Sequence, residues 1–184
     1  MGSRAEICMR ITISGPPGSG KTTACKRLSE KLEIKAVVFG EFFRKLAKER
    51  GMTLAEFGEL AEHDPSIDET IDGMILTVAK ENTDIILESR LAAHMLTKND
   101  ISAFRVYLEA SLKVRIGRVG LREGESFDNV YSHTVERESS EAKRYKMYYD
   151  IDIEDKSVYD LIINTDDLDP DQVVNKILKG IEGC

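Results

Sequence analysis

Short apolar runs rich in β-branched residues recur along the chain, separated by longer segments in which apolar positions repeat every three or four residues. The short runs predict buried strands of a parallel sheet, because strands covered on both faces are almost continuously hydrophobic. These runs are residues 10–14, 35–39, 84–88, 103–109 and 160–164.

The longer segments have the period of helices. They are residues 22–32, 41–50, 53–63, 67–80, 112–122, 127–149 and 171–181. Strands that alternate with helices indicate an α/β fold in which helices cover both faces of a parallel sheet.

Residues 40–82 interrupt the simple alternation, because they place several helices between the second and third strands. We interpret them as a helical insertion that projects from a core made of residues 9–39 and 83–184. No repeat is visible and no proline lies between Pro65 and Pro170. The sequence therefore predicts a single domain over residues 1–184.

The composition narrows the classes of partner. The 184 residues include 26 Lys and Arg against 33 Asp and Glu, a formal net charge of −7. A protein that wraps nucleic acid needs a surplus of positive charge, so we expect no nucleic-acid partner. The acidic surplus lies in residues 150–184, with 3 basic and 10 acidic side chains. The rest of the chain is balanced, which leaves room for a compact anion site.

The three cysteines, Cys8, Cys25 and Cys184, form no Cys-x-x-Cys pair and are odd in number. They predict neither a disulfide framework nor a zinc site. No apolar run approaches the roughly 20 residues that span a bilayer, and the N-terminus lacks the apolar core of a secretory signal. We expect a cytoplasmic monomer with no membrane partner.

The strongest motif follows the first predicted strand and opens the first predicted helix. It reads Gly15-Pro16-Pro17-Gly18-Ser19-Gly20-Lys21-Thr22 and fits the P-loop pattern G-x-x-x-x-G-K-[ST]. The glycines let backbone N–H groups turn toward phosphate oxygens, and the helix presents its positive N-terminus to the same anion. Lys21 is expected to reach the β- and γ-phosphates and Thr22 to hold Mg²⁺, so the motif predicts binding of a nucleoside triphosphate.

A second motif points to a different class of P-loop protein. Thr97-Lys98-Asn99-Asp100 matches the [NT]-K-x-D guanine-reading motif of GTPases. It precedes the predicted strand 103–109, whereas the GTPase motif follows a strand, and the chain contains no Asp-x-x-Gly switch sequence. We interpret it as an exposed polar turn.

Arginines supply candidates for a second anion site. Arg115, Arg118 and Arg122 fall within about 60° of one another on a helix, and such a row repels itself unless an anion lies opposite. Arg115 fits a solvated face as well as an anion site. Only Arg122 has an acid, Glu125, at helical spacing.

Arg44 and Arg90 stand at strand-to-helix junctions, at the edge where open α/β sheets bind ligands. Both are expected to contact phosphate. Glu88 ends the third predicted strand and is a candidate ligand of Mg²⁺. Arg137 and Arg144 lie seven residues apart on one helix face, and Arg137 can also pair with Glu141.

The remaining ionisable residues predict no catalytic base. His63, His94 and His133 accompany no nucleophile and are expected at the surface. A phosphate monoester is already largely a dianion at pH 7 and attacks without deprotonation. Arginines and a metal without a base therefore suit a phosphate acceptor.

Several stretches, in this order along the chain, carry a family resemblance. They read MRITISGPPGSGKTT, GEFFRKLAKERGM, ILESRLA, GRVGLREG and ERESSEAKRYKMYYDIDIEDKSVYDLIINT. From Met9 to its C-terminus the chain resembles the nucleoside monophosphate kinases, and it is similar to the short archaeal-type cytidylate kinases. The resemblance implies a P-loop NTPase fold with a five-stranded parallel sheet in the order 2-3-1-4-5. It also implies phosphorylation of CMP or dCMP by ATP with Mg²⁺.

The resemblance also implies roles for residues. The loop from Gly15 to Thr23 would hold the ATP phosphates, with Arg118 near the ATP base and phosphates. Arg44 and Arg90 would grip the acceptor phosphate. The side chains expected to contact the phosphoryl group during its transfer are those of Lys21, Arg122, Arg137 and Arg144. Residues 40–82 would form the monophosphate-binding subdomain and residues 122–127 a short lid. Ser89 stands where the family often has glycine, and Ser140 where bacterial relatives tend to carry arginine.

The sequence indicates less clearly which residues recognise the nucleobase of the acceptor monophosphate. Asp64, Asp68 and Asp72 are candidate acceptors for the amino group of cytosine, although an acidic helix face in water explains them equally well. Two alternatives stay open: a kinase for another monophosphate or a metabolite hydroxyl, and a binding module that uses nucleotide as a switch.

Overall fold

A single parallel sheet organises the computed structural model, which describes residues 9–124 and 126–183. Its strands are β1 (Arg10–Ser14), β2 (Lys35–Val38), β3 (Ile85–Glu88), β4 (Phe104–Glu109) and β5 (Leu161–Asn164). They pair in the order β2-β3-β1-β4-β5, and every pairing is parallel. This order confirms the one that the resemblance implied. Cys8, Glu125 and Cys184, which entered the sequence predictions, lie outside the described residues.

The helices follow the predicted periodic segments closely. They are α1 (Lys21–Leu32), α2 (Phe39–Glu49), α3 (Leu54–His63), α4 (Pro65–Glu81), α5 (Ala92–Lys98), α6 (Leu112–Glu123), α7 (Phe127–Tyr149) and α8 (Pro170–Glu182). Phe39 begins α2 instead of ending a strand. No membrane-spanning candidate occurs among the helices of the described chain, since none combines enough length with enough apolar character.

Helix α5 was not predicted from the sequence. Its residues from Ala92 to Leu96 are all buried, so the helix lacks the polar face from which its period could be recognised. Burial also makes one prediction wrong: His94 is only 6% exposed and packs edge-on against Tyr159, away from the surface. The segment Thr97–Asp100 ends α5 and turns toward β4, as expected of a polar turn.

Apolar side chains cover the sheet on both faces. Ile11 and Ile13 of β1 pack with residues of α1 and α8, among them Leu28 and Val174. On the other face, Leu87 of β3 belongs to a second cluster that includes side chains of α4, α5 and α7. Helices therefore cover both faces of the sheet, and its polar strand ends remain as the place for chemistry.

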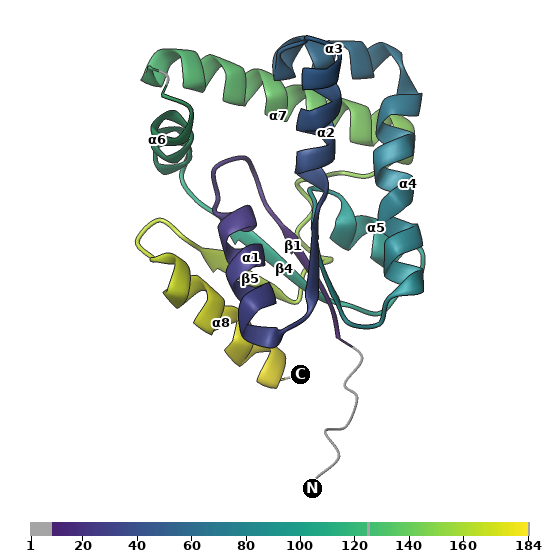
Figure 1. Cartoon of the computed structure of the whole chain (residues 1–184), viewed down its shortest axis with the longest axis vertical. Coiled ribbons are helices and arrows are strands. Elements are labelled where there is room, and N and C mark those ends of the chain that lie inside the picture. Colours follow the sequence, from purple (N-terminus) through teal and green to yellow (C-terminus); the bar gives the residue numbers. More distant parts are fainter. Residues whose placement is uncertain (1–8, 125, 184) are drawn as a thin grey trace, which may run out of the picture.

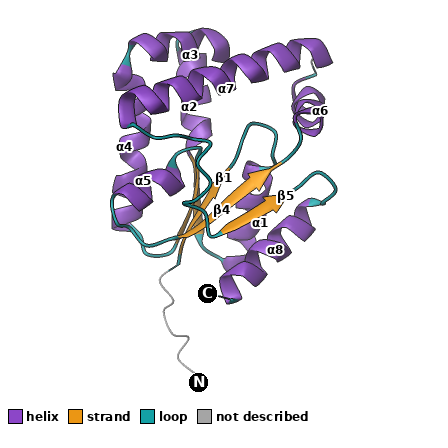
Figure 2. Cartoon of the chain, turned by 180° about the vertical axis from the view of Figure 1, so that it is seen from behind, coloured by secondary structure: helices purple, strands orange, loops and turns teal. Residues whose placement is uncertain are grey.

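Helices α2, α3 and α4 lie between β2 and β3 in the chain and stand together beside one end of the sheet (Figure 1). Thr53 begins α3 with a capping box to Glu56, and the carboxylate of Asp64 caps α4 ahead of Pro65. The long helix α7 crosses that end of the sheet and packs along α3, as the view from behind also shows (Figure 2). The insertion and α7 thus meet over the loop between β1 and α1.

Candidate active site

The loop between β1 and α1 has the shape that the P-loop motif predicts. Gly15 has φ +144°, and a Cβ there would lie 2.0 Å from the backbone oxygen of Leu108. Gly18 has φ +81°, and its Cβ would lie 2.6 Å from the backbone oxygen of Arg115. Both positions therefore require glycine. No side chain caps the N-terminus of α1, so its first N–H groups are available to an anion.

Lys21 folds back over this loop and donates a hydrogen bond from Nζ to the backbone oxygen of Pro16 at 2.9 Å. Burial lowers its pKa to about 8; the charges of Arg90 and Arg137 act in the same direction, and Glu88 opposes them. An ammonium group that is costly to bury among other cations is stabilised by a bound polyphosphate. Lys21 is thus poised for an anion.

Thr22 and Glu88 meet beside the loop. The hydroxyl of Thr22 donates to Oε2 of Glu88 at 2.9 Å, and Glu88 is only 4% exposed. These are the hard oxygen donors that Mg²⁺ prefers, and Mg²⁺ is commonly held by one or two carboxylates together with substrate phosphates. Among the described residues, no group of three or more His, Cys, Asp and Glu could hold a metal by itself. The pair fits a metal that is completed by phosphate oxygens.

A cavity of about 450 Å³ opens over the P-loop. It collects most of the predicted site residues: Pro17, Gly18, Ser19, Gly20, Lys21, Thr22, Thr23, Arg44, Asp68, Glu88, Arg90, Arg118, Arg122, Arg137 and Arg144. Gly15 and Pro16 shape the loop without lining the cavity. Residues that lie far apart in the chain therefore converge on one space large enough for a small ligand.

Two of the predicted arginines share one buried carboxylate, Glu141. Nε of Arg137 donates to Oε1 of Glu141 at 2.8 Å, and Nε of Arg90 lies 3.0 Å from Oε2. The second contact is an ion pair whose angle makes no hydrogen bond. Burial raises the pKa of Glu141, but Arg137 and Arg90 outweigh burial and hold it below its usual value. Glu141 is thus a fixed anion at the centre of the arginine cluster.

Arg44 and Arg122 belong to the same field of positive charge. Burial, followed by the charge of Arg137, lowers the pKa of Arg44, and Arg122 contributes in the same direction. Cations held close enough to disfavour one another's charge create a site for an anion.

The arginines of α6 hold the helix against the P-loop. Arg118 donates to the hydroxyl of Thr165 at 3.0 Å and to its backbone oxygen at 2.6 Å, and it also reaches the backbone oxygen of Gly18 at 3.4 Å. Arg115 donates to the backbone oxygen of Pro17 at 3.2 Å and pairs with Glu138. Arg115 is 7% exposed and does not line the cavity, so a solvated position for it is wrong.

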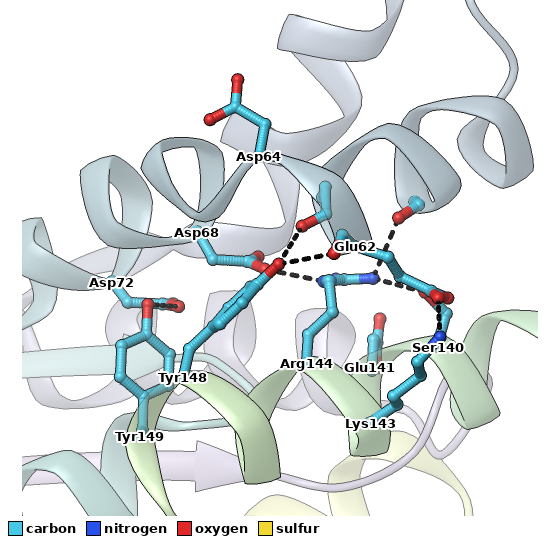
Figure 3. Close-up of polar contacts among 12 residues, drawn as sticks. Glu62, Asp64, Asp68, Asp72, Ser140, Glu141, Lys143, Arg144, Tyr148 and Tyr149 are labelled. Atoms are coloured by element: carbon cyan, nitrogen blue, oxygen red, sulfur yellow. Dashed lines mark hydrogen bonds and ion pairs between the residues drawn. The ribbon is translucent and has the colours of Figure 1, made fainter.

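The acids of α4 differ from one another (Figure 3). The carboxylate of Asp64 accepts from the backbone N–H of Ser66 and serves as a helix cap. Asp68 and Asp72 are 3% and 6% exposed and line the cavity. The expectation of an acidic helix face in water is therefore wrong for Asp68 and Asp72.

Arg144 is bound at the junction between α7 and the insertion. Its Nε donates to Asp68 at 2.7 Å, and its Nη1 donates to the hydroxyl of Ser140 at 2.6 Å and to the backbone oxygen of Gly58 at 3.5 Å. Its guanidinium carbon lies 5.6 Å from the centre of the Phe43 ring. These contacts engage the side chain with protein groups in the cavity wall, and its role at the transferring phosphoryl group stays a prediction.

Sequence reasoning underestimated Glu141 and missed the apolar wall. Glu141 entered only as a partner of Arg137, although its place between Arg137 and Arg144 on one helix was a usable signal. Phe39, Phe43, Ile71 and Tyr145 line the cavity beside the arginines. Phe43, Ile71 and Tyr145 fall at apolar positions of predicted helices, and periodicity does not distinguish a core from a ligand wall, while Phe39 was predicted to end a strand.

The family model and the relatives that match this chain in sequence all carry the name cytidylate kinase. A model described as the cytidylate kinase-like family matches residues 10–167. A cytidylate kinase from Methanosphaerula palustris is 50% identical over 159 residues, covering 86% of this chain and 89% of that protein. One from Methanococcoides burtonii is 48% identical over 174 residues, covering 95% and 97%. One from Haloarcula marismortui is 44% identical over 174 residues, covering 95% and 90%.

Solved structures share the architecture at low sequence identity. An uncharacterized protein from Eubacterium ventriosum has a TM-score of 0.70 and 20% identity, covering 96% of this chain and 99% of that chain. A shikimate kinase from Acinetobacter baumannii has a TM-score of 0.62 and 16% identity, covering 99% and 98%. At these identities the likeness shows the P-loop kinase fold alone.

Proposed function

This chain belongs to the cytidylate kinase-like family, and from that premise we propose that it transfers the γ-phosphoryl group of ATP to CMP or dCMP. The products are ADP and CDP or dCDP. The observation that carries the proposal is the convergence of Arg44, Arg90 and Arg137 on the cavity that also holds Lys21 of the P-loop. A triphosphate alone does not need a second cluster of cations, whereas a phosphate acceptor does.

On the donor side, the loop from Gly15 to Thr23 binds the ATP phosphates through backbone N–H groups. Arg118, beside Thr165 and Gly18, contributes near the ATP base and phosphates. Thr22 and Glu88 are the residues that would hold Mg²⁺. When bound, Mg²⁺ neutralises part of the charge on the phosphates.

On the acceptor side, Arg44 and Arg90 hold the phosphate of the monophosphate. Among the described residues that line the cavity there is no histidine or cysteine, and the reaction needs no general base because the acceptor is already a dianion. Positioning the two phosphates and screening their charge supplies the catalysis.

Lys21, Arg122 and Arg137 act on the phosphoryl group as it is transferred, through electrostatic stabilisation. Arg144 and Asp68 contribute differently. We assign them to the acceptor side, where their ion pair joins α7 to α4 and fixes the wall that the monophosphate meets. Residues 40–82 serve as the monophosphate-binding subdomain, and residues 122–127 as a short lid that excludes water.

Coupled measurement of ADP production tests this function. With ATP and Mg²⁺ present, the rate is expected to rise strongly when CMP is added and to be abolished by Lys21→Ala. A nucleotide switch shows slow hydrolysis that is indifferent to CMP, and a kinase for a metabolite hydroxyl shows no response to any monophosphate. A cytoplasmic monomer without nucleic-acid or membrane partners remains our prediction.

A further inference from the structure

Asp72 lies in the wall of the active-site cavity and has no assigned role in holding phosphate. It is 6% exposed, one turn of α4 after Asp68, and it lines the cavity together with Ile71, Phe43 and Tyr145. A carboxylate in such a place needs a partner, because a buried charge without one is costly. Figure 3 shows Asp72 facing the hydroxyl of Tyr149, with Asp68 beside it on the same helix.

Only one oxygen of Asp72 is used by the described residues. The hydroxyl of Tyr149 on α7 donates to Oδ2 at 3.0 Å, and no hydrogen bond from the described chain reaches Oδ1. The neighbouring acids are placed differently: Asp64 caps α4 and does not line the cavity, and the charge of Asp68 is paired with that of Arg144 at 2.7 Å. Asp72 is therefore the acid of α4 in the cavity wall that has a neutral hydroxyl as its partner and an oxygen left for a ligand.

The surroundings of Asp72 make such a donor favourable. Burial raises its pKa to about 7, the charges of Asp68 and Glu141 add to this, and Tyr149 and Arg144 act in the opposite direction. Tyr145 packs against the same region from α7. An N–H donor from a ligand would stabilise the ionised carboxylate that these groups now disfavour.

The chemistry of the pyrimidine ring then decides what the donor is. Cytosine carries an amino group at C4, which donates, whereas uracil carries an oxygen at the same position, which accepts. An ionised carboxylate only accepts, so it pairs with the first and is repelled by the second. We propose that Oδ1 of Asp72, oriented by the hydroxyl of Tyr149, accepts a hydrogen bond from the 4-amino group of cytosine and selects CMP over UMP. This inference rests on the proposed function and adds a specificity-determining pair to it.

The pair predicts an unusual outcome for Asp72→Asn. The hydroxyl of Tyr149 can keep donating to the amide oxygen, and the amide NH₂ then takes the place of Oδ1. That group donates, so it suits the oxygen of uracil and clashes with the amino group of cytosine. The substitution is therefore expected to shift the preference from CMP toward UMP, and not only to weaken the binding of CMP. Removing the hydroxyl as well, in Asp72→Asn with Tyr149→Phe, frees the amide to turn and relaxes the preference.

The test is the ratio of kcat/KM for CMP to that for UMP, measured in the full chain. Asp72→Asn is expected to lower this ratio about tenfold or more, with at least part of the change coming from faster use of UMP. Asp64→Asn is the matched control, since it removes the same charge from the same helix and retains a good helix cap. It should leave the ratio unchanged. Thermal unfolding of each variant checks that it is folded.

The outcomes separate the inference from the proposed function. If the unaltered protein phosphorylates CMP but Asp72→Asn slows CMP and UMP by the same factor, Asp72 contacts the ribose or supports the fold, and the inference is wrong. If Asp72→Asn does not fold, Tyr149→Phe decides: a ratio that falls supports the pair, and an unchanged ratio overturns it. If the unaltered protein does not phosphorylate CMP, the proposed function itself fails.

Discussion

The hydroxyl of Thr22 donates to the carboxylate of Glu88 at 2.9 Å, so the first turn of α1 and the end of β3 meet at one point beside the P-loop. Residues separated by 66 positions in the chain come together because β1 and β3 are neighbours in the sheet. The register pairs Ile13 with Glu88, which places Glu88 level with the end of β1, one residue before its last residue Ser14. The sheet order thus determines where a metal can be held.

Glu88→Gln is expected to weaken the response to Mg²⁺ by about 10- to 100-fold, because it removes the carboxylate that fits the ion beside Thr22. The measurement is ADP production with CMP as a function of Mg²⁺ concentration at fixed ATP. Glu109→Gln is the control: Glu109 ends strand β4, on the other side of β1, pairs with Lys156 and does not line the cavity. An unchanged Mg²⁺ midpoint for Glu88→Gln would remove Glu88 from the metal site.

Glu141→Gln is expected to destabilise the ligand-free protein by about 3–5 kcal/mol, since Arg90 and Arg137 lose the buried anion that they share. Inorganic phosphate should restore stability, because it supplies a new anion to the same two side chains. The prediction is a larger rise in Tm on adding phosphate for this variant than for the unaltered protein.

Glu138→Gln provides the comparison for that experiment. Glu138 lies on the same helix and pairs with Arg115, which is also buried, but neither residue lines the cavity. Loss of this pair should lower Tm without a gain in the response to phosphate. Equal phosphate responses in the two variants would mean that Glu141 does not face the phosphate site.

Asp72→Asn is expected to stabilise the ligand-free protein in a way that depends on pH. Burial raises the pKa of Asp72 from 3.8 to about 7, so the folded protein binds a proton there that the unfolded chain releases. The contribution of protonated Asp72 to the free energy of unfolding is fully present below about pH 4 and is lost as the pH rises to about 7. The gain in Tm from Asp72→Asn should therefore be larger at pH 8 than at pH 5. A gain that is the same at both values would show that Asp72 titrates normally.

The P-loop was predictable because its chemistry is local. Strand, glycine-rich turn and helix follow one another between Arg10 and Leu32, and the backbone geometry of Gly15 and Gly18 depends on contacts that any such loop must make. The strands were likewise recognised within one residue of each end, because buried β-branched runs are unambiguous when polar segments separate them. The sheet order came from the family resemblance and not from the pattern.

The arginine cluster was predictable only as a set of candidates. Periodicity placed Arg137 and Arg144 on one face of α7, but their partners come from different elements. Glu141 forms an ion pair with Arg90, which follows β3, while Asp68 of α4 forms an ion pair with Arg144. Pairings between distant residues depend on how α7 lies across the insertion, and a single sequence does not carry that information. Arg115 was misjudged for the same reason, because its partner Glu138 belongs to another helix.

The central claim is that the cavity over the P-loop accepts CMP as the phosphate acceptor, and a panel of acceptors tests it most directly. The purified protein would be given ATP and Mg²⁺ with CMP, dCMP, UMP, AMP or GMP, and kcat/KM would be measured for each from ADP production, with the diphosphate product identified. The account predicts that CMP or dCMP is used fastest and that one CDP or dCDP forms for each ADP. Faster turnover of AMP or UMP than of CMP, or ADP production that ignores every monophosphate, would contradict it.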